Sequence, residues 1–141
     1  MIVLDTNVLS EIMRPRPSPA VLQWVAAQEP LSVFTTTITR AEILYGIEIL
    51  PPGKRRTALR AAVESMLAEE FGSRILPFDE DAAHAFATIA SRRQTLGSPI
   101  SQFDAMIAGI ASSRHAAVAT RNVRDFQDCG IPVVDPFGMD E

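Results

Sequence analysis

Cysteine, histidine and lysine are nearly absent from this chain of 141 residues. Cys129 is the only cysteine, so no disulfide can form within the chain. Together with His84 and His115 it supplies too few ligands for a structural zinc site. A chain with so little cysteine is typical of reducing compartments, and we expect a cytoplasmic location.

Long apolar runs and glycine-rich loops are also missing. No apolar run approaches the roughly 20 residues that span a membrane, and no basic segment precedes an apolar stretch at the amino terminus as in a signal peptide. We therefore expect no membrane partner. The first apolar run is not followed by a glycine-rich loop, which argues against a nucleotide-binding module.

Apolar residues nevertheless make up 47% of the sequence, enough for a globular core. At this length we expect a single domain, residues 1–141. The net charge of −4 by itself argues against a nucleic-acid partner, but the arginines fall in clusters that suit phosphate contacts. Each cluster could equally be a solvated helix end. The basic clusters are Arg14/Arg16, Lys54/Arg55/Arg56/Arg60, Arg92/Arg93 and Arg121/Arg124.

Predicted strands and helices alternate along the chain, which is typical of a parallel sheet with helices on both faces. Ser18 and Asp79 are the expected caps of the second and fifth helices. The predicted strands are residues 2–4, 31–35, 74–78, 117–120 and 132–134. The predicted helices are residues 8–13, 19–29, 39–50, 55–71, 80–96 and 101–114.

Three acidic residues stand at comparable points of this pattern. Asp5 ends the first predicted strand, and Glu42 and Asp104 lie near the starts of predicted helices. Singly, each has an ordinary explanation as a helix cap, since Thr39-x-x-Glu42 matches a capping box and Ser101-x-x-Asp104 resembles one. In an open α/β sheet, however, the segments that follow the strands meet at one edge, where ligands bind.

We expect the three carboxylates to converge at that edge, together with Asn122 and Asp125 after the fourth strand. Like charges in one cavity raise one another's pKa unless a counter-ion is present. Oxygen ligands of this kind suit Mg²⁺, with Mn²⁺ as an alternative. Such a metal can activate water and neutralise charge on a phosphodiester. The hydroxyls of Thr6 and Thr120 are placed to hydrogen-bond a ligand carboxylate or a metal-bound water.

Four motifs follow one another in a fixed order along the chain. They are Asp5-Thr6-Asn7, Thr39-Arg40-Ala41-Glu42-Ile43, Phe103-Asp104-Ala105-Met106-Ile107-Ala108 and Thr120-Arg121-Asn122-x-x-Asp125-Phe126. The set resembles the PIN-domain nucleases, and in particular the small stand-alone toxins of bacterial VapBC-type toxin–antitoxin pairs. The resemblance covers essentially the whole chain.

The resemblance implies a PIN-like three-layer α/β/α sandwich around a parallel sheet of about five strands, and Mg²⁺-dependent endoribonuclease activity. It maps the metal-binding, catalytic acids of the family onto Asp5, Glu42 and Asp104. Many family members have an aspartate where this chain has Asn122, which we take as the fourth catalytic position. Asparagine adds no charge, so a second metal should bind more weakly here. Asp125 could serve instead, or could cap a short turn.

The resemblance also implies a homodimer and a cognate antitoxin that blocks the site in a hetero-oligomer. We expect a groove of the early helices to bind the antitoxin, although the same residues could simply be core. We expect four arginines to contact the RNA backbone. The antitoxin candidates are Leu9, Ile12, Met13, Trp24 and Tyr45, and the RNA candidates are Arg92, Arg93, Arg121 and Arg124.

The main alternative is a catalytically silent PIN-fold module that only binds RNA or a protein partner. A receiver-type phosphoacceptor domain needs a lysine late in the chain, and none follows Lys54. A haloacid-dehalogenase-like phosphatase needs a second aspartate two residues after Asp5, where Asn7 stands. The presence of all three acids favours the nuclease.

Overall fold

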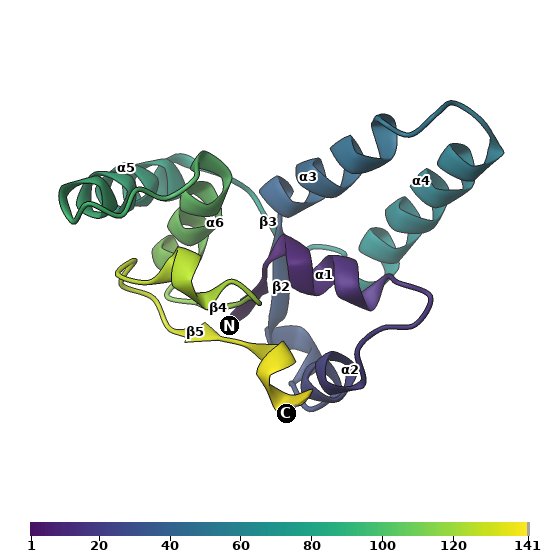
Figure 1. Ribbon diagram of the computed structural model, residues 1–141, viewed down its shortest axis with the longest axis horizontal. Helices are drawn as coiled ribbons and strands as arrows, with labels where there is room; N and C mark the ends of the chain where they lie inside the picture. The colour runs from purple at the N-terminus through teal and green to yellow at the C-terminus, as the bar shows by residue number, and fades with distance from the viewer. Residues whose placement is uncertain (141) are drawn as a thin grey trace.

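A five-stranded parallel sheet forms the centre of the computed structural model, which describes residues 1–140 (Figure 1). The strand order is β3-β2-β1-β4-β5, and each neighbouring pair is parallel. The strands are β1 (Ile2–Leu4), β2 (Val33–Thr36), β3 (Ile75–Leu76), β4 (Ala117–Ala119) and β5 (Val133–Val134). The helices are α1 (Thr6–Ile12), α2 (Pro19–Ala26), α3 (Thr37–Glu48), α4 (Lys54–Met66), α5 (Glu80–Thr95) and α6 (Gln102–Ser113).

Helices cover both faces of this sheet, so the predicted three-layer α/β/α architecture is confirmed. Adjacent side chains of β1 point to opposite faces. Val3 joins a core with Ile107 of α6, whereas Leu4 joins a second core with Val8 of α1 and Val63 of α4. In Figure 1, α5 and α6 lie on one side of the strands, and α1 to α4 lie on the other. No helix within residues 1–140 has the length and apolar character needed to cross a membrane.

Side-chain caps set where most of the helices begin. Ser18, Asp79 and Ser101 each accept a hydrogen bond from the backbone N–H three residues further on. Such a bond satisfies one of the amide donors that the first helical turn leaves unpaired. The predicted caps at Ser18 and Asp79 are therefore confirmed.

The predicted start of α3 is wrong. Thr36, the last residue of β2, caps this helix, because its Oγ1 accepts the N–H of Thr39 at 3.0 Å. Thr39 consequently lies inside the helix and is fully buried, so it forms no capping box with Glu42. The ordinary cap explanation for Glu42 is thus excluded.

Two further predicted helices end earlier than expected. The helix predicted for residues 19–29 stops at Ala26, and the 3₁₀ segment η1 (Pro30–Ser32) follows it. The helix predicted for residues 55–71 changes at Leu67 into a π-helical turn, η2 (Leu67–Phe71). Gly72 ends that turn in the left-handed region, with φ 54°. Two further 3₁₀ segments, η3 (Val123–Phe126) and η4 (Pro136–Asp140), lie before and after β5.

Helices α5 and α6 approach each other closely at Gly109. A Cβ atom at this position would lie 2.7 Å from the Ala82 carbonyl oxygen and 2.9 Å from the Phe86 nitrogen. Both are backbone atoms of α5, so neither can move aside as a flexible side chain would. The close approach fixes how α6 lies on the sheet, and α6 carries Asp104.

We expect Gly109→Ala to lower the free energy of unfolding by about 1–3 kcal/mol, because the added methyl group separates the two helices. Gly46→Ala is the matched control: Gly46 also lies inside a helix, and an added Cβ there meets nothing within 4 Å. Alanine should be neutral or stabilising at that position, by up to about 1 kcal/mol. Urea denaturation of both variants checks this, and equal stabilities would contradict it.

Candidate active site

Asp5 lies at the topological switch point of the sheet. β1 pairs with β2 on one side and with β4 on the other, and the chain connections diverge from this point. In open α/β sheets ligands bind at such a point, beyond the carboxyl ends of the strands. Leu4 is paired with Ala119, which places Asp5 beside Thr120. The Asp5 N–H donates to the Ala119 carbonyl (2.9 Å), and the Thr120 hydroxyl donates to Asp5 Oδ2 (2.8 Å).

Burial makes the Asp5 carboxylate hard to ionise. Asp5 is only 4% exposed. Burial raises the pKa of Asp5 from 3.8 to about 6, against the lowering effect of hydrogen bonds from the Thr120 hydroxyl and the Thr6 N–H. The negative charges of Asp104 and Glu42 raise it further. At neutral pH the carboxylate is therefore mostly ionised in a place that favours its neutral form.

Thr6 links the first motif to Glu42. Glu42 lies in the second turn of α3, half-buried. The Thr6 hydroxyl donates to Glu42 Oε1 (2.8 Å), and Thr6 Oγ1 lies 3.1 Å from Thr39 Oγ1. Because Thr6 also donates its backbone N–H to Asp5 Oδ1, one threonine holds two of the three acids.

Asp104 stands in the first turn of α6, where Ser101 caps the helix. Burial raises the pKa of Asp104, and the charge of Asp125 raises it too, whereas the Ser101 side chain and the charge of Arg93 lower it. Asp125 is exposed within η3 and does not cap it, since Asn122 occupies the cap position. The cap explanation for Asp125 is therefore wrong, and its charge acts on Asp104.

Asn7 contributes to the site, although no role was predicted for it within the Asp5-Thr6-Asn7 motif. Its Nδ2 donates to Asp5 Oδ2 (3.1 Å) and to Thr120 Oγ1 (3.2 Å), and its Oδ1 accepts the Arg121 N–H (3.0 Å). Thr120 Oγ1 also accepts the Asn122 N–H (3.0 Å). Asn7 and Thr120 therefore fasten the loop after β4 to the Asp5 carboxylate. Its position two residues after Asp5 was the only signal in the sequence.

The chemistry of these residues fits a hard divalent cation. The carboxylates of Glu42 and Asp104 are near enough to raise the pKa of Asp5, and neutralising such mutually repelling oxygens is what Mg²⁺ or Mn²⁺ does. Within residues 1–140, however, no three histidine, cysteine, aspartate or glutamate side chains are placed to hold a metal ion as they stand. A shared ion therefore requires the acidic side chains to move closer together.

Comparison with known proteins shows which family this chain belongs to. Residues 2–130 match the family model of the PIN domain. The chain belongs to the PIN-domain family. It is 37% identical over 137 residues to the VapC ribonuclease Y4jK of Sinorhizobium fredii, which covers 97% of this chain and 98% of that protein. Its identity to the toxin FitB of Neisseria gonorrhoeae is also 37%, over 97% of this chain and 99% of FitB.

Solved structures agree with this assignment. The PIN domain described here matches a chain of the crystal structure of FitAcB from Neisseria gonorrhoeae with a TM-score of 0.90 and 37% identity, covering 97% of this chain and 99% of that one. It also matches a chain of a toxin–antitoxin complex from Klebsiella pneumoniae with a TM-score of 0.70 and 25% identity, covering 96% and 98%.

Four arginines are expected to contact RNA. For Arg93 this prediction is wrong. Its side chain lies inside the PIN domain, 4% exposed, and its nitrogens donate to backbone carbonyls. This burial keeps the guanidinium away from an RNA backbone. Arg92, Arg121 and Arg124 are exposed, and the Arg121 guanidinium lies over the Phe137 ring, 4.6 Å from its centroid.

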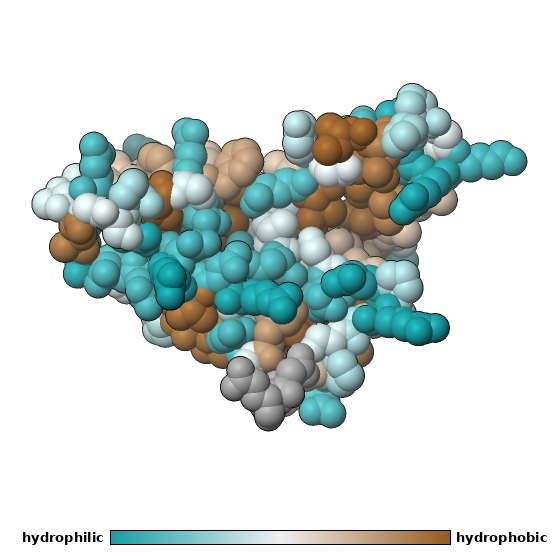
Figure 2. Space-filling model, in the orientation of Figure 1, coloured by the Kyte–Doolittle hydropathy of each residue, from teal (hydrophilic) through white to brown (hydrophobic). Residues whose placement is uncertain are grey.

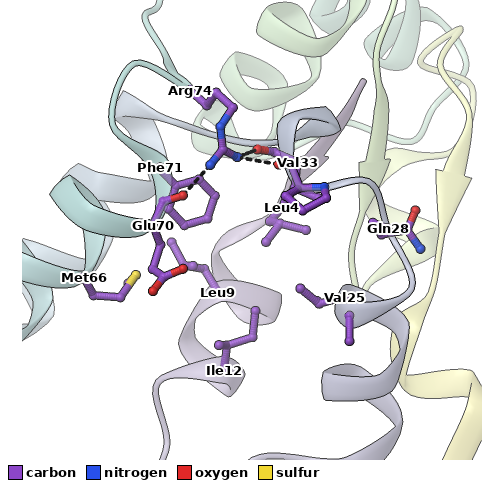
Figure 3. Close-up of a pocket in the computed structure, with 12 residues that line it drawn as sticks. Leu4, Leu9, Ile12, Val25, Gln28, Val33, Met66, Glu70, Phe71 and Arg74 are labelled. Atoms are coloured by element: carbon purple, nitrogen blue, oxygen red, sulfur yellow. Dashed lines mark hydrogen bonds between the residues drawn. The ribbon is translucent and has the colours of Figure 1, made fainter.

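A mainly apolar groove crosses α1, with a volume of about 370 Å³ (Figure 3). Leu9 and Ile12 of α1 line it, with Val25 of α2 on one side and Met66 of α4 on the other. Figure 3 shows the Arg74 guanidinium at one end, bonded to the Val33 carbonyl. None of the three acids lines this groove.

The five antitoxin candidates do not share one groove. Leu9 and Ile12 line it, but Leu9 is almost fully buried and forms part of the core beneath it. Met13 and Trp24 pack against the same core without lining the groove. Tyr45 is 68% exposed on α3, outside the groove.

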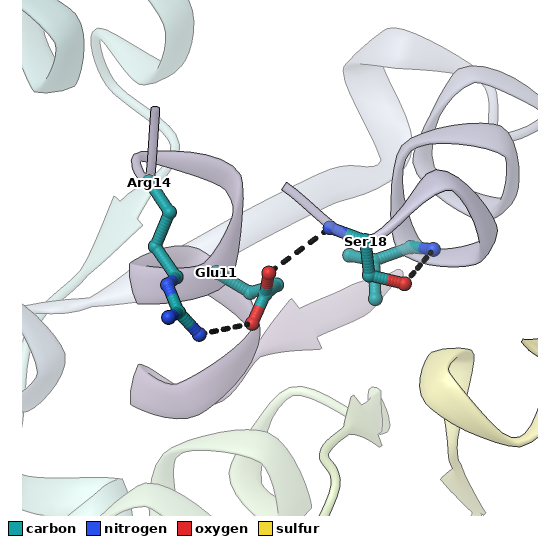
Figure 4. Close-up of polar contacts among 4 residues, drawn as sticks. Glu11, Arg14 and Ser18 are labelled. Carbon is teal, nitrogen blue, oxygen red and sulfur yellow. Dashed lines mark hydrogen bonds and ion pairs between the residues drawn. The ribbon is translucent and has the colours of Figure 1, made fainter. Parts of the chain in front are cut away.

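Glu11 fixes the turn between α1 and α2 (Figure 4). Glu11 is nearly buried; its Oε2 accepts the Ser18 N–H at 3.0 Å, and its Oε1 accepts from Arg14 Nη1 at 3.4 Å. Ser18 is the cap of α2, so this carboxylate sets where α2 begins relative to α1. Both helices contribute residues to the lining of the groove, Ile12 from α1 and Val25 from α2.

Removing the Asp5 charge should stabilise the metal-free protein. The pKa of about 6 lies above the unfolded value of 3.8, so the buried charge subtracts stability above about pH 6, and this loss fades as the pH falls toward 4. We expect Asp5→Asn to raise the free energy of unfolding at neutral pH by about 1–2 kcal/mol in EDTA. The gain over wild type should shrink near pH 4.

Urea denaturation at the two pH values measures this gain. Asp81→Asn is the control, because Asp81 is exposed in the first turn of α5. A gain at Asp5 that does not change with pH, or a loss of stability at neutral pH, would show that the charge is not the cause.

Proposed function

We propose that this protein is the toxin of a toxin–antitoxin pair and acts as a divalent-metal-dependent endoribonuclease. The observation that carries the proposal is the grouping of Asp5, Glu42 and Asp104 around the switch point of a PIN fold. The relatives support it, since one is named a VapC ribonuclease and another the toxin FitB.

Asp5, Glu42 and Asp104 would hold the metal, Mg²⁺ or Mn²⁺. When bound, the metal lowers the pKa of a water molecule and neutralises charge on the phosphodiester. The chain's own residues orient the ligands. Thr120, Asn7 and the Thr6 N–H donate to Asp5, which leaves one lone pair of its Oδ1 for the cation. The Thr6 hydroxyl donates to Glu42 Oε1, which leaves Glu42 Oε2 for the cation.

The fourth position is assigned to Asn122, with Asp125 beside it. Asn122 is exposed, and its N–H is held by Thr120 Oγ1, so its side-chain oxygen can reach toward the site. Asp125 supplies the negative charge that Asn122 lacks, because its charge acts on Asp104. Arg92, Arg121 and Arg124 are proposed contacts for the RNA backbone, since all three are exposed cations.

The partner is proposed to be a cognate antitoxin that binds the groove across α1. The matching chain from Klebsiella pneumoniae belongs to a toxin–antitoxin complex. The groove offers an apolar floor with Glu70 and Arg74 as polar groups at its edge, the arrangement that an amphipathic helix needs.

Self-association into a homodimer is proposed on a different surface. Tyr45 and Ile49 are well exposed at the α3 side of the α3–α4 hairpin, and Figure 2 shows apolar surface over this part of the molecule. Contiguous exposed apolar surface of this kind marks an interaction site.

Cleavage of RNA should depend on both Mg²⁺ and the acids. We expect Asp5→Asn and Asp104→Asn each to lower kcat by about 100-fold or more, because each removes a metal ligand. EDTA should abolish wild-type cleavage, and added Mg²⁺ should restore it. Asp81→Asn is the matched control and should cleave like wild type, since Asp81 is exposed on α5, outside the acidic site. Equal cleavage by wild type and Asp5→Asn would contradict the catalytic role of Asp5, and no cleavage by wild type would leave the silent binding module as the function.

Binding of the antitoxin should depend on the groove. We expect Val25→Arg to weaken it by at least tenfold, because the longer, charged side chain fills an apolar cavity. Leu22→Arg is the control on the same helix, since Leu22 is exposed and does not line the groove. Calorimetric titration with the protein encoded by the adjacent reading frame measures both. Equal weakening by the two variants would place the contact elsewhere.

A further inference from the structure

Arg93 is the only buried cation within residues 1–140. Taking an ion out of water costs several kcal/mol unless its hydrogen-bonding groups are paired. No carboxylate of the described part of the chain lies within ion-pair distance of this guanidinium. Its hydrogen bonds go to backbone carbonyls instead. The segments that carry these carbonyls therefore show what the buried charge does.

The carbonyls come from two segments that are far apart in sequence. Nε donates to the Ser98 carbonyl (2.7 Å), and Nη2 lies 3.3 Å from Ser98 Oγ. Nη1 donates to the Asp125 carbonyl (2.7 Å) and to the Gln127 carbonyl (3.0 Å). Ser98 lies in the link into α6, and Asp125 and Gln127 lie in and just after η3. One planar guanidinium therefore ties the link between α5 and α6 to η3.

These two segments carry one side of the acidic site. α6 presents Asp104 in its first turn, and η3 contains Asp125 and follows Asn122. The charge of Arg93 acts against the charge of Asp125 on Asp104. The positive charge of the guanidinium thus opposes the mutual repulsion of two acids, Asp104 and Asp125, which would otherwise separate the segments that bear them.

We propose that Arg93 is a positioning residue of the acidic site: by bonding the carbonyls of both segments it holds Asn122 and Asp125 against Asp104. The inference rests on the proposed nuclease function and deepens it. Arginine is suited to this task, because its rigid fork reaches carbonyls in several directions at once. Lysine carries the same charge on a single nitrogen and cannot bond Ser98 and η3 in the same way.

The test compares Arg93→Lys and Arg93→Met with wild type, and uses Arg55→Lys and Arg55→Met as controls. Arg55 is exposed in the first turn of α4, outside the site. Three measurements are made on the full chain: Mn²⁺ affinity of the metal-free protein by electron paramagnetic resonance, amide hydrogen exchange at residues 122–127, and kcat and KM for RNA cleavage with Mg²⁺. Circular dichroism verifies folding.

We expect Arg93→Lys to remain folded, to exchange faster at residues 122–127 and to bind Mn²⁺ about 10–100-fold more weakly. Its kcat should fall with KM nearly unchanged, because Arg93 does not contact the substrate. Both Arg55 variants should behave like wild type. Arg93→Met should match or exceed the loss in Arg93→Lys.

Three results would overturn the proposal. Wild-type Mn²⁺ affinity and exchange in Arg93→Lys would show that charge alone suffices, even if Arg93→Met fails to fold. Faster exchange without any change in Mn²⁺ affinity or kcat, or loss of folding in Arg93→Lys, would make the role purely structural. If wild type itself neither binds Mn²⁺ nor cleaves RNA, the nuclease function fails, while the exchange data still decide whether Arg93 holds η3.

Discussion

A buried carboxylate at the centre of a parallel sheet is the constraint on which the site depends. Asp5 follows the middle strand, and the pairing of β1 with β4 places Thr120 beside it. The surroundings favour the neutral acid, yet three donors, the Thr120 hydroxyl, the Asn7 amide and the Thr6 N–H, point at it. An ionised carboxylate held in this way lowers the free energy of unfolding of the protein. Such a loss of stability is typical of functional sites.

The rest of the acidic site is assembled from elements that the sheet brings to the same edge. Glu42 reaches it because Thr36 ends β2 and begins α3 without an intervening loop. Asp104 reaches it because Gly109 lets α6 lie close against α5. The acids repel one another, and a buried Arg93 bonded to three carbonyls stands behind one side of them. The proposed cation would offset this repulsion.

The sequence predicts the strands and helices better than it predicts which side chains are buried and what they contact. Strand and helix alternation, the caps Ser18 and Asp79 and the parallel sheet are all found in the structure. The start of α3 was missed because Thr36 and Thr39 are equally good caps locally, and only the end of β2 selects the first. The prediction that Arg93 contacts RNA is wrong, because helix periodicity does not tell how deeply the far face of α5 is covered. The prediction that Tyr45 lines the groove is wrong, because it rests only on the residue type.

The sequence by itself determined the order of the elements and the identity of the acids, since alternation, caps and the Asp5, Glu42 and Asp104 motifs are local patterns. Only the tertiary structure decided which groups meet. The register of β1 against β4 brings residues 5 and 120 together across 115 positions, and the packing of α5 against η3 buries Arg93. Contacts of this range depend on how sheets and helices pack, and no local pattern in the chain encodes them.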